Sequence, residues 1–283
     1  MKWWKSCTGL REQMNKVRKM DDAIYFDFIL PTAKEHDDFS NKFPINEILA
    51  LLNPYANLTI SINPFNNASL QESEMQSILN TWYSNVETLL FDIKHAYGFL
   101  LFFYNAGIPD ERVTGSGKES NKYFPDFKHQ DWYNQKSFRF YAEIIISKIF
   151  SVLDNYGMIL FIHYDKDFID TKKKSIYFHT PINDSKLKMD EIVRNKLQAI
   201  LENEVYINTK KIRNDILHNR TPLKLSSNLA FVKSENGFGM GLKIDYIKSK
   251  EVFEIIENLI NDVLIESTKN IFSEQGVTHN ESN

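Results

Sequence analysis

The stretch from Lys211 to Arg220 holds the residues best suited to chemistry. Asn214 and His218 are four positions apart, so they share one face if the stretch is helical. Arg213 lies one step round the helix, and its long side chain can reach that face. A guanidinium donates two parallel hydrogen bonds to a phosphate and keeps its charge, whereas an imidazole gains or loses a proton near neutral pH. The three side chains therefore predict a site that binds a phosphate group and moves a proton.

The same residues also have a purely structural explanation. Cations in the last turn of a helix stabilise its negative end by about 0.3–1 kcal/mol each. Arg213, His218 and Arg220 stand just before Thr221 and Pro222, which end the predicted helix. Residue types and spacing alone leave both interpretations open.

The distribution of charge limits where a nucleic acid would bind. The 283-residue chain has a formal net charge of -3, which excludes a surface that is basic throughout. Between residues 208 and 224, however, five cations accompany the single anion Asp215, namely Lys210, Lys211, Arg213, Arg220 and Lys224. We therefore predict that any RNA contact is local, and that Lys210, Lys211 and Arg220 attract the RNA backbone in a salt-dependent way.

The composition favours a helical protein in a reducing compartment. With 42% apolar residues, 10 Gly and 8 Pro, the chain can bury a large core in long regular elements. Its one cysteine, Cys7, excludes an intrachain disulfide and a thiolate zinc site. The N-terminus does not read as a secretory signal, and Lys148 and Asp154 interrupt the apolar stretch 144–162. We expect a cytoplasmic protein without a membrane anchor.

Signals for a metal or a cofactor are weak. His163, Asp165 and Asp167 lie close together in the sequence and could be metal ligands, although a solvated helix end explains them more simply. No two histidines have the i, i+4 spacing of a helical metal site. We expect no metal and no cofactor.

Apolar periodicity predicts four long amphipathic helices, which would pack as a helical bundle. These helices span residues 77–104, 131–163, 190–219 and 250–272. Strand-like alternation on both sides of Asn236 and Gly237 predicts a β-hairpin within residues 229–247, inserted before the last helix.

One polar pair, Glu143 and Lys148, lies inside the apolar second helix. A satisfied interaction within the core is the simpler explanation for it. If the two side chains point at the third helix, they could instead support the site by orienting Arg213 or His218.

The first 75 residues differ from the rest, because prolines break them into short elements. They predict a small α+β region with strands at 23–30 and 57–62 and a helix at 44–52. The helical bundle would then occupy residues 76–275, followed by a disordered polar tail at 276–283. Within the bundle, residues 107–130 should form an exposed loop, and residues 175–181 a strand or an irregular crossing.

The sequence resembles the HEPN superfamily. The mark of that superfamily is an Arg, usually followed by a polar residue, with a His four to six positions later on a late helix of a four-helix bundle. Arg213, Asn214 and His218 match this mark, and the arrangement of elements is similar over residues 77–272. The branch that it most resembles is a group of mostly uncharacterised bacterial proteins of clostridial type. Many members that are toxic to their own host carry a Tyr two places after the His, where this chain has Arg220, so regulation through a modified tyrosine is not expected.

The resemblance implies a four-helix HEPN-like domain with metal-independent endoribonuclease activity. Such cleavage needs a base for the 2'-hydroxyl proton, charge stabilisation on the phosphate and an acid for the departing 5'-oxygen, and it leaves a 2',3'-cyclic phosphate. His218 would transfer protons, Arg213 would stabilise the phosphate, and Asn214 would hold His218 or the phosphate in position. Because one motif offers one histidine, we expect a homodimer in which two motifs share a cleft.

Members of the superfamily often act in toxin–antitoxin or antiviral systems, which implies RNA and an antitoxin or defence protein as partners. The main alternative is a non-catalytic HEPN-like module that dimerises, or binds a nucleotide or a protein, and keeps the motif for architecture. A structural helical protein unrelated to the superfamily is the third interpretation.

Overall fold

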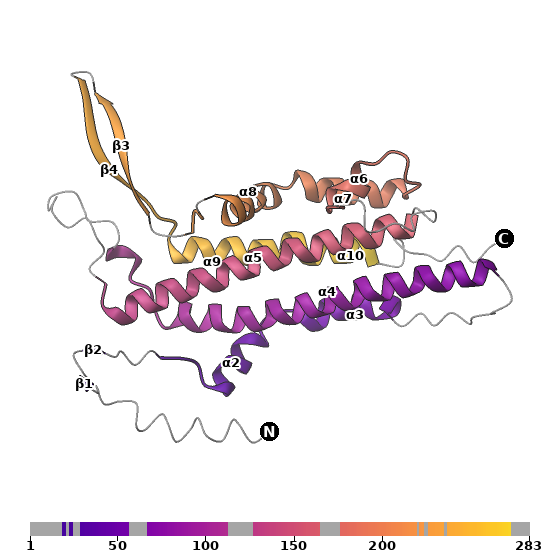
Figure 1. Cartoon of the computed structure of the whole chain (residues 1–283), viewed down its shortest axis with the longest axis horizontal. Coiled ribbons are helices and arrows are strands. Elements are labelled where there is room, and N and C mark those ends of the chain that lie inside the picture. The colour runs from indigo at the N-terminus through magenta and orange to yellow at the C-terminus, as the bar shows by residue number, and fades with distance from the viewer. Residues whose placement is uncertain are drawn as a thin grey trace.

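The computed structural model describes residues 19–20, 23–24, 29–56, 67–112, 127–164, 176–219, 221–223, 226–234 and 237–272. This part of the chain is mainly helical (Figure 1). Its helices are α2 (Ala33–Ser40), α3 (Ile45–Ala56), α4 (Asn67–Asn105), the short 3-10 helix η2 (Asp110–Arg112), α5 (His129–Tyr164), α6 (His179–Asn183), α7 (Glu191–Glu202), α8 (Glu204–His218), α9 (Ser249–Asn258), the π-helical segment η3 (Leu259–Ile265) and α10 (Glu266–Phe272).

The described strands form two small antiparallel pairs. Strand β1 (Lys19–Met20) pairs with β2 (Ala23–Ile24). Strand β3 (Ser226–Ser234) pairs with β4 (Gly237–Asp245) in a register that sets Ser234 opposite Gly237. The β3–β4 pair projects away from the helices at the end of the molecule where α4 passes into α5 (Figure 1).

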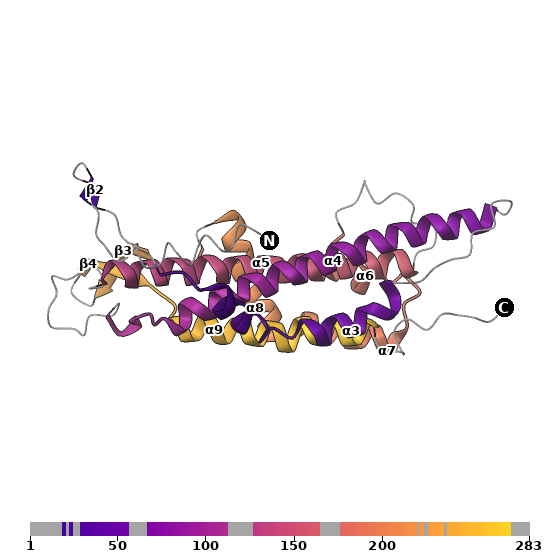
Figure 2. The same ribbon diagram turned by 90° about the horizontal axis from the view of Figure 1, so that it is seen from below.

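Two long antiparallel helices, α4 and α5, form the centre of the molecule (Figure 1). Helices α2 and α3 pack against α4, and α6 and α8 pack against α5. The run α9, η3 and α10 lies along the bundle, where α10 contacts α3, α5 and α7 and η3 contacts α8 (Figure 2). The motif helix α8 is therefore seated on both the central α5 and the last helical run.

Helix α5 is central because apolar residues occupy nearly all of its sides. Its fully buried side chains include Phe138, Ile145, Ile146, Ile149, Val152, Leu153 and Tyr156. By length and composition α5 could cross a membrane, but 67% of its most apolar window is buried inside the protein. That burial is typical of a core helix.

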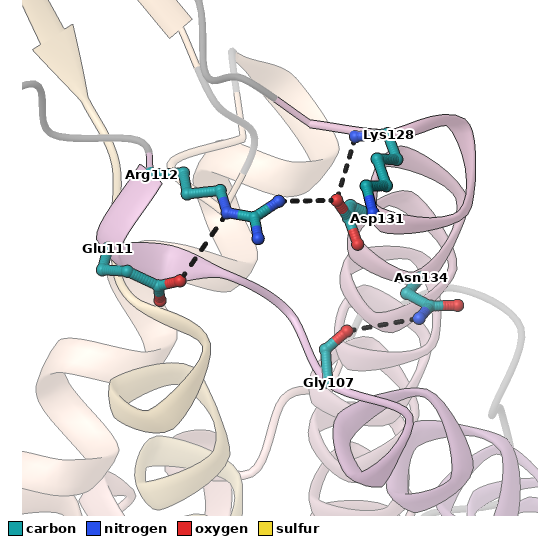
Figure 3. A network of polar contacts seen from close by, with 6 residues as sticks. All are labelled: Gly107, Glu111, Arg112, Lys128, Asp131 and Asn134. Carbon is teal, nitrogen blue, oxygen red and sulfur yellow. Dashed lines mark hydrogen bonds and ion pairs between the residues drawn. The ribbon is translucent and has the colours of Figure 1, made fainter.

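The end of α4 and the start of α5 are joined by a polar network of described residues (Figure 3). The Asp131 carboxylate accepts the Lys128 backbone N–H at 2.9 Å and pairs with the Arg112 guanidinium at 3.3 Å. The Asn134 amide donates to the carbonyl of Gly107 at 3.2 Å. Gly107 has a φ of +89°, a conformation that favours glycine and allows α4 to end there. These contacts fix where α5 begins.

A buried arginine holds the entry of α9 against α5. The Arg139 side chain is 2% exposed, donates to the carbonyl of Ile247 and lies over the ring of Tyr246 at 4.9 Å from its centroid. The Tyr246 hydroxyl donates to Asp110, whose carboxylate also accepts the backbone N–H of Ser249 at 2.7 Å. We call these five residues the Arg139 clasp.

The N-terminal segment is more helical and better integrated than its sequence predicts. The predicted helix 44–52 corresponds to α3, but α2 was not predicted, and the predicted strand 57–62 lies outside the described residues. Helix α4 begins at Asn67, and residues 67–76 contain no Gly or Pro that would break it, so the predicted boundary at residue 75 falls inside a helix. Buried side chains of the segment, Phe43, Ile45, Ile48 and Leu52, belong to the same core as α4 and α10.

Two predictions for the middle of the chain were wrong. The predicted helix 190–219 is two helices, because Asn203 adopts an extended conformation with a ψ of 132° and caps α8 by accepting the Val205 backbone N–H at 2.7 Å. The segment 175–181 was predicted as a strand or an irregular crossing, but its residues 179–181 belong to the short helix α6. The predicted loop 107–130 is described only up to residue 112 and from residue 127, and the polar tail lies outside the described residues.

Candidate functional site

The motif residues lie in the last two turns of α8. The helix begins at its cap, Asn203, and ends at His218, and the Asn219 side chain returns a hydrogen bond to Asp215 at 2.9 Å. Asp215 therefore accepts a hydrogen bond within the helix end.

Two faces of α8 have opposite environments. The inner face carries the buried Tyr206 and Thr209, with Ile212 and Ile216 packed against the core. The outer face is exposed at Ile207, Asn208, Lys211, Asn214, Leu217 and His218. Asn214 and His218 thus share the solvent-facing side, as their spacing predicts.

Arg213 lies on the border between these two faces. It is half-buried, and its Nε has no hydrogen-bond partner in the described part of the chain. Its Nη1 donates to the side-chain oxygen of Asn214 at 3.2 Å. The guanidinium therefore extends from the packed side of α8 toward the exposed Asn214, and the structure brings these two motif residues into contact.

A half-buried carboxylate of α5 lies in the electrostatic range of Arg213. Burial raises the pKa of Asp154, and the Phe178 backbone N–H together with Arg213, His179 and Lys210 opposes the rise. The Phe178 N–H donates to Asp154 Oδ1 at 3.1 Å. Three cationic or titratable side chains from α6 and α8 thus surround Asp154 without a contact ion pair among the described residues.

The tyrosine beneath the motif responds to the same charges. Burial and, to a lesser extent, Asp154 raise the pKa of Tyr206 to about 12, and Arg213 opposes the rise. Lys210 lies over the Tyr206 ring, with its Nζ 5.5 Å from the ring centroid. Tyr206 is therefore a neutral, packed support for the two cations above it.

The other predicted site residues are not all near the motif. Lys210 lies beside Tyr206 and Lys211 is exposed on the outer face, whereas Arg220 lies outside the described residues. Lys148 pairs with Asp92 of α4 at 2.8 Å, and Glu143 has a buried Oε1 with no partner in the described structure. Lys148 thus turns to α4, and among the described residues no hydrogen bond or ion pair joins Glu143 or Lys148 to the motif, so a role of this pair in orienting Arg213 or His218 stays a prediction.

Asp154 and His179 are the residues near the motif that sequence reasoning missed as site residues. Asp154 had a detectable signal, because it interrupts an otherwise apolar stretch of α5. His179 had none, because only the packing of α6 on α5 brings it near Lys210. Among the described residues, no group of three His, Cys, Asp or Glu side chains lies close enough to hold a metal ion.

A motif helix with Arg, Asn and His, seated late in a bundle of long helices, is the layout of a HEPN domain. A family model agrees: the HEPN_Cthe2314-like HEPN family matches residues 82–275, which is more than half of the chain. The chain therefore belongs to this HEPN family, as the motif resemblance predicted. No curated protein and no solved structure matches it.

Proposed function

We propose that this HEPN protein is a metal-independent endoribonuclease whose catalytic residues are Arg213, Asn214 and His218, acting in a cleft between two copies of the chain. The observation that carries the proposal is the hydrogen bond from Arg213 Nη1 to Asn214, with Asn214 and His218 both exposed on the same side of α8. A guanidinium and an imidazole can thus meet an outside phosphate. A helix-end role alone would not require Arg213 to turn toward Asn214.

The reaction assigns one step to each type of side chain. An imidazole takes the proton from the 2'-hydroxyl, the 2'-oxygen bonds to phosphorus, and the bond from phosphorus to the 5'-oxygen breaks. A second imidazole gives a proton to the departing 5'-oxygen, which leaves a 2',3'-cyclic phosphate. Arg213 holds the negative charge that develops on the phosphate oxygens. Asn214 keeps the guanidinium in place.

A second copy would supply the second imidazole. Ile207 and Leu217 are 39% and 49% exposed on the outer face of α8, close in sequence to Asn214 and His218. Exposed apolar side chains on a helix face are favourable to bury, and an isologous dimer would bury them while bringing two motifs together. Lys210, Lys211 and Arg220 would then attract the RNA backbone toward that cleft. A role in a toxin–antitoxin or antiviral system would follow from the same activity.

The test is RNA cleavage by purified protein in the presence of EDTA. We expect wild type to cut total RNA, and Arg213→Ala and His218→Ala to cut about 10²–10⁴-fold more slowly. The melting temperatures of the two variants should stay within about 2 °C of wild type, because His218 is exposed and Arg213 is only half-buried. Arg112→Ala and His129→Ala, which change the same residue types at the other end of α5, are the matched controls and should cut normally.

A separate variant tests whether the cleft between two copies is needed. Leu217→Asp places a charge on the outer face of α8, so it should convert a dimer into a monomer in light scattering and reduce cleavage with the dimer. Equal cutting by wild type, Arg213→Ala and His218→Ala would instead point to a contaminating nuclease and end the enzymatic proposal. A stable dimer that does not cut would favour the non-catalytic dimerisation module, which the exposed Ile207 and Leu217 support equally.

A further inference from the structure

Two aromatic rings near α8 stack on one another, and neither belongs to the HEPN motif. The rings of Tyr177 and His179 are parallel, with an interplanar angle of 5° and centroids 5.8 Å apart. Tyr177 is 47% exposed although it is a large aromatic residue, and His179 is half-buried. We call these two residues the Tyr177–His179 platform.

The backbone under the platform is fixed against α5. Phe178, between the two rings, is fully buried, and its N–H donates to Asp154 Oδ1 at 3.1 Å. The Tyr177 carbonyl would lie only 2.8 Å from a Cβ on Gly157, so this part of the chain is pressed closely onto α5. The Tyr177 N–H is held by Thr180 Oγ1 at 3.1 Å. Phe178 points inward, and the residues on either side of it carry the two rings. Because the backbone here is already fixed, binding a ligand would cost little conformational entropy.

The platform is next to the cations of the motif helix. Burial and the nearby Lys210 lower the pKa of His179, and Asp154 opposes that change. Lys210 is in turn three positions before Arg213, on the same side of α8, and both lie in range of Asp154. Arg213, Lys210 and the platform thus all lie around Asp154, and they offer a guanidinium, a second cation and the exposed ring of Tyr177.

We infer that the Tyr177–His179 platform stacks an unpaired base of the RNA whose scissile phosphate lies at Arg213, while Lys210 contacts the backbone between the two. This inference rests on the proposed function, and it names the substrate class as single-stranded RNA. Aromatic side chains beside a basic surface bind unpaired bases by stacking, whereas a duplex keeps its bases stacked on one another. The neutral form of His179 suits this contact, because a neutral ring presents a face without charge.

Binding is measured with fluorescence anisotropy on the full chain carrying His218→Ala, which prevents cleavage and leaves the platform intact. The probes are a labelled single strand of about ten nucleotides and the duplex of the same sequence. We expect Tyr177→Ala to weaken binding of the single strand about 5- to 100-fold and to leave duplex binding unchanged. Tyr177→Phe keeps the ring face and should bind within about twofold of the parent. Phe140→Ala removes an exposed aromatic side chain at a different place, on α5, so it is the matched control and should have no effect.

The outcomes separate this inference from the proposed function. If wild type cuts RNA through His218 but Tyr177→Ala binds the single strand as tightly as its parent, the platform is overturned and the nuclease stands. If wild type does not cut but single-strand binding depends on the Tyr177 ring, the nuclease fails and the platform stands. Loss of binding in Tyr177→Phe as large as in Tyr177→Ala would also overturn stacking, since the hydroxyl and not the ring face would then be the contact.

Discussion

The protein contains two arginines on packed helices whose surroundings lead to opposite roles. Arg139 of α5 is 2% exposed, and Arg213 of α8 is half-buried. Each has a buried Nε with no partner in the described structure, so both bear some cost of desolvation. The Arg139 guanidinium nevertheless lies over two aromatic rings and donates to a backbone carbonyl. Arg213 instead donates to the exposed Asn214. A guanidinium that is enclosed serves the fold, and one that ends at the surface remains free for a phosphate.

The largest expected difference between the two is in stability. Arg139→Ala would leave a cavity in the core and the Ile247 carbonyl without its donor, so we expect a loss of about 3 kcal/mol in the free energy of unfolding. Arg139→Met refills the volume without a charge and should lose about 1 kcal/mol or less. Arg213→Ala should lose less than about 1 kcal/mol. Urea unfolding measures all three.

One result would contradict the difference expected between Arg139 and Arg213. If Arg213→Ala lost as much stability as Arg139→Ala, Arg213 would also be a residue of the fold, and its place at the catalytic site would need another explanation. Normal RNA cleavage per folded molecule by Arg139→Met would sharpen the contrast, because the Arg139 clasp should matter only for folding.

A smaller effect is expected where α6 meets α5. Gly157→Ala places a Cβ 2.8 Å from the Tyr177 carbonyl and 2.9 Å from Phe178 Cα, so the backbone of this segment must move. We expect a loss of about 1–3 kcal/mol and weaker binding of single-stranded RNA, because the displaced segment carries the platform. Gly98→Ala, which crowds His36 of α2 at 2.9 Å, is a control that strains a different face of the bundle. If Gly157→Ala kept the stability and the RNA binding of wild type, the backbone at Tyr177 and Phe178 would be able to move away from α5 at little cost.

The smallest expected effect is a change in pH dependence at Asp154. Burial raises the pKa of Asp154 in the folded protein above its unfolded value near 4. The folded state then binds this proton more tightly, so the stability that Asp154 contributes is highest at low pH and falls as the pH rises through the raised pKa. Asp154→Asn keeps an acceptor for Phe178 and should be more stable than wild type at pH 7 by less than about 1 kcal/mol. Melting curves at several pH values test this; a variant less stable than wild type at pH 7 would mean that the neighbouring cations outweigh burial.

The long helices could be predicted from the sequence because their apolar pattern is continuous. The prediction of 131–163 agrees with α5, and 250–272 agrees with the run from α9 to α10. The break at Asn203 was missed, because the apolar spacing continues across it and only the backbone conformation reveals the cap. The helix α6 is too short for periodicity to detect.

The site was predictable only where it depends on a single helix. The shared face of Asn214 and His218 follows from their spacing on α8. The charged groups near the motif come from other elements: Asp154, which interacts with Arg213, is on α5, and His179, which interacts with Asp154 and Lys210, is on α6, and no sequence spacing relates them to α8. For the same reason the direction of Lys148 toward Asp92 on α4 could not be inferred.

The extended residue Asn203 has a consequence for the direction of the motif helix. It interrupts the backbone hydrogen-bond ladder between α7 and α8, so the two helices do not share one rigid axis. The tilt of α8 then depends on its packing against α5 and η3, where Tyr206 and Thr209 are buried, as well as on its contacts with α7. Substitutions beneath those two side chains would therefore change the direction of Arg213 and Asn214 while the long central helices stay in place.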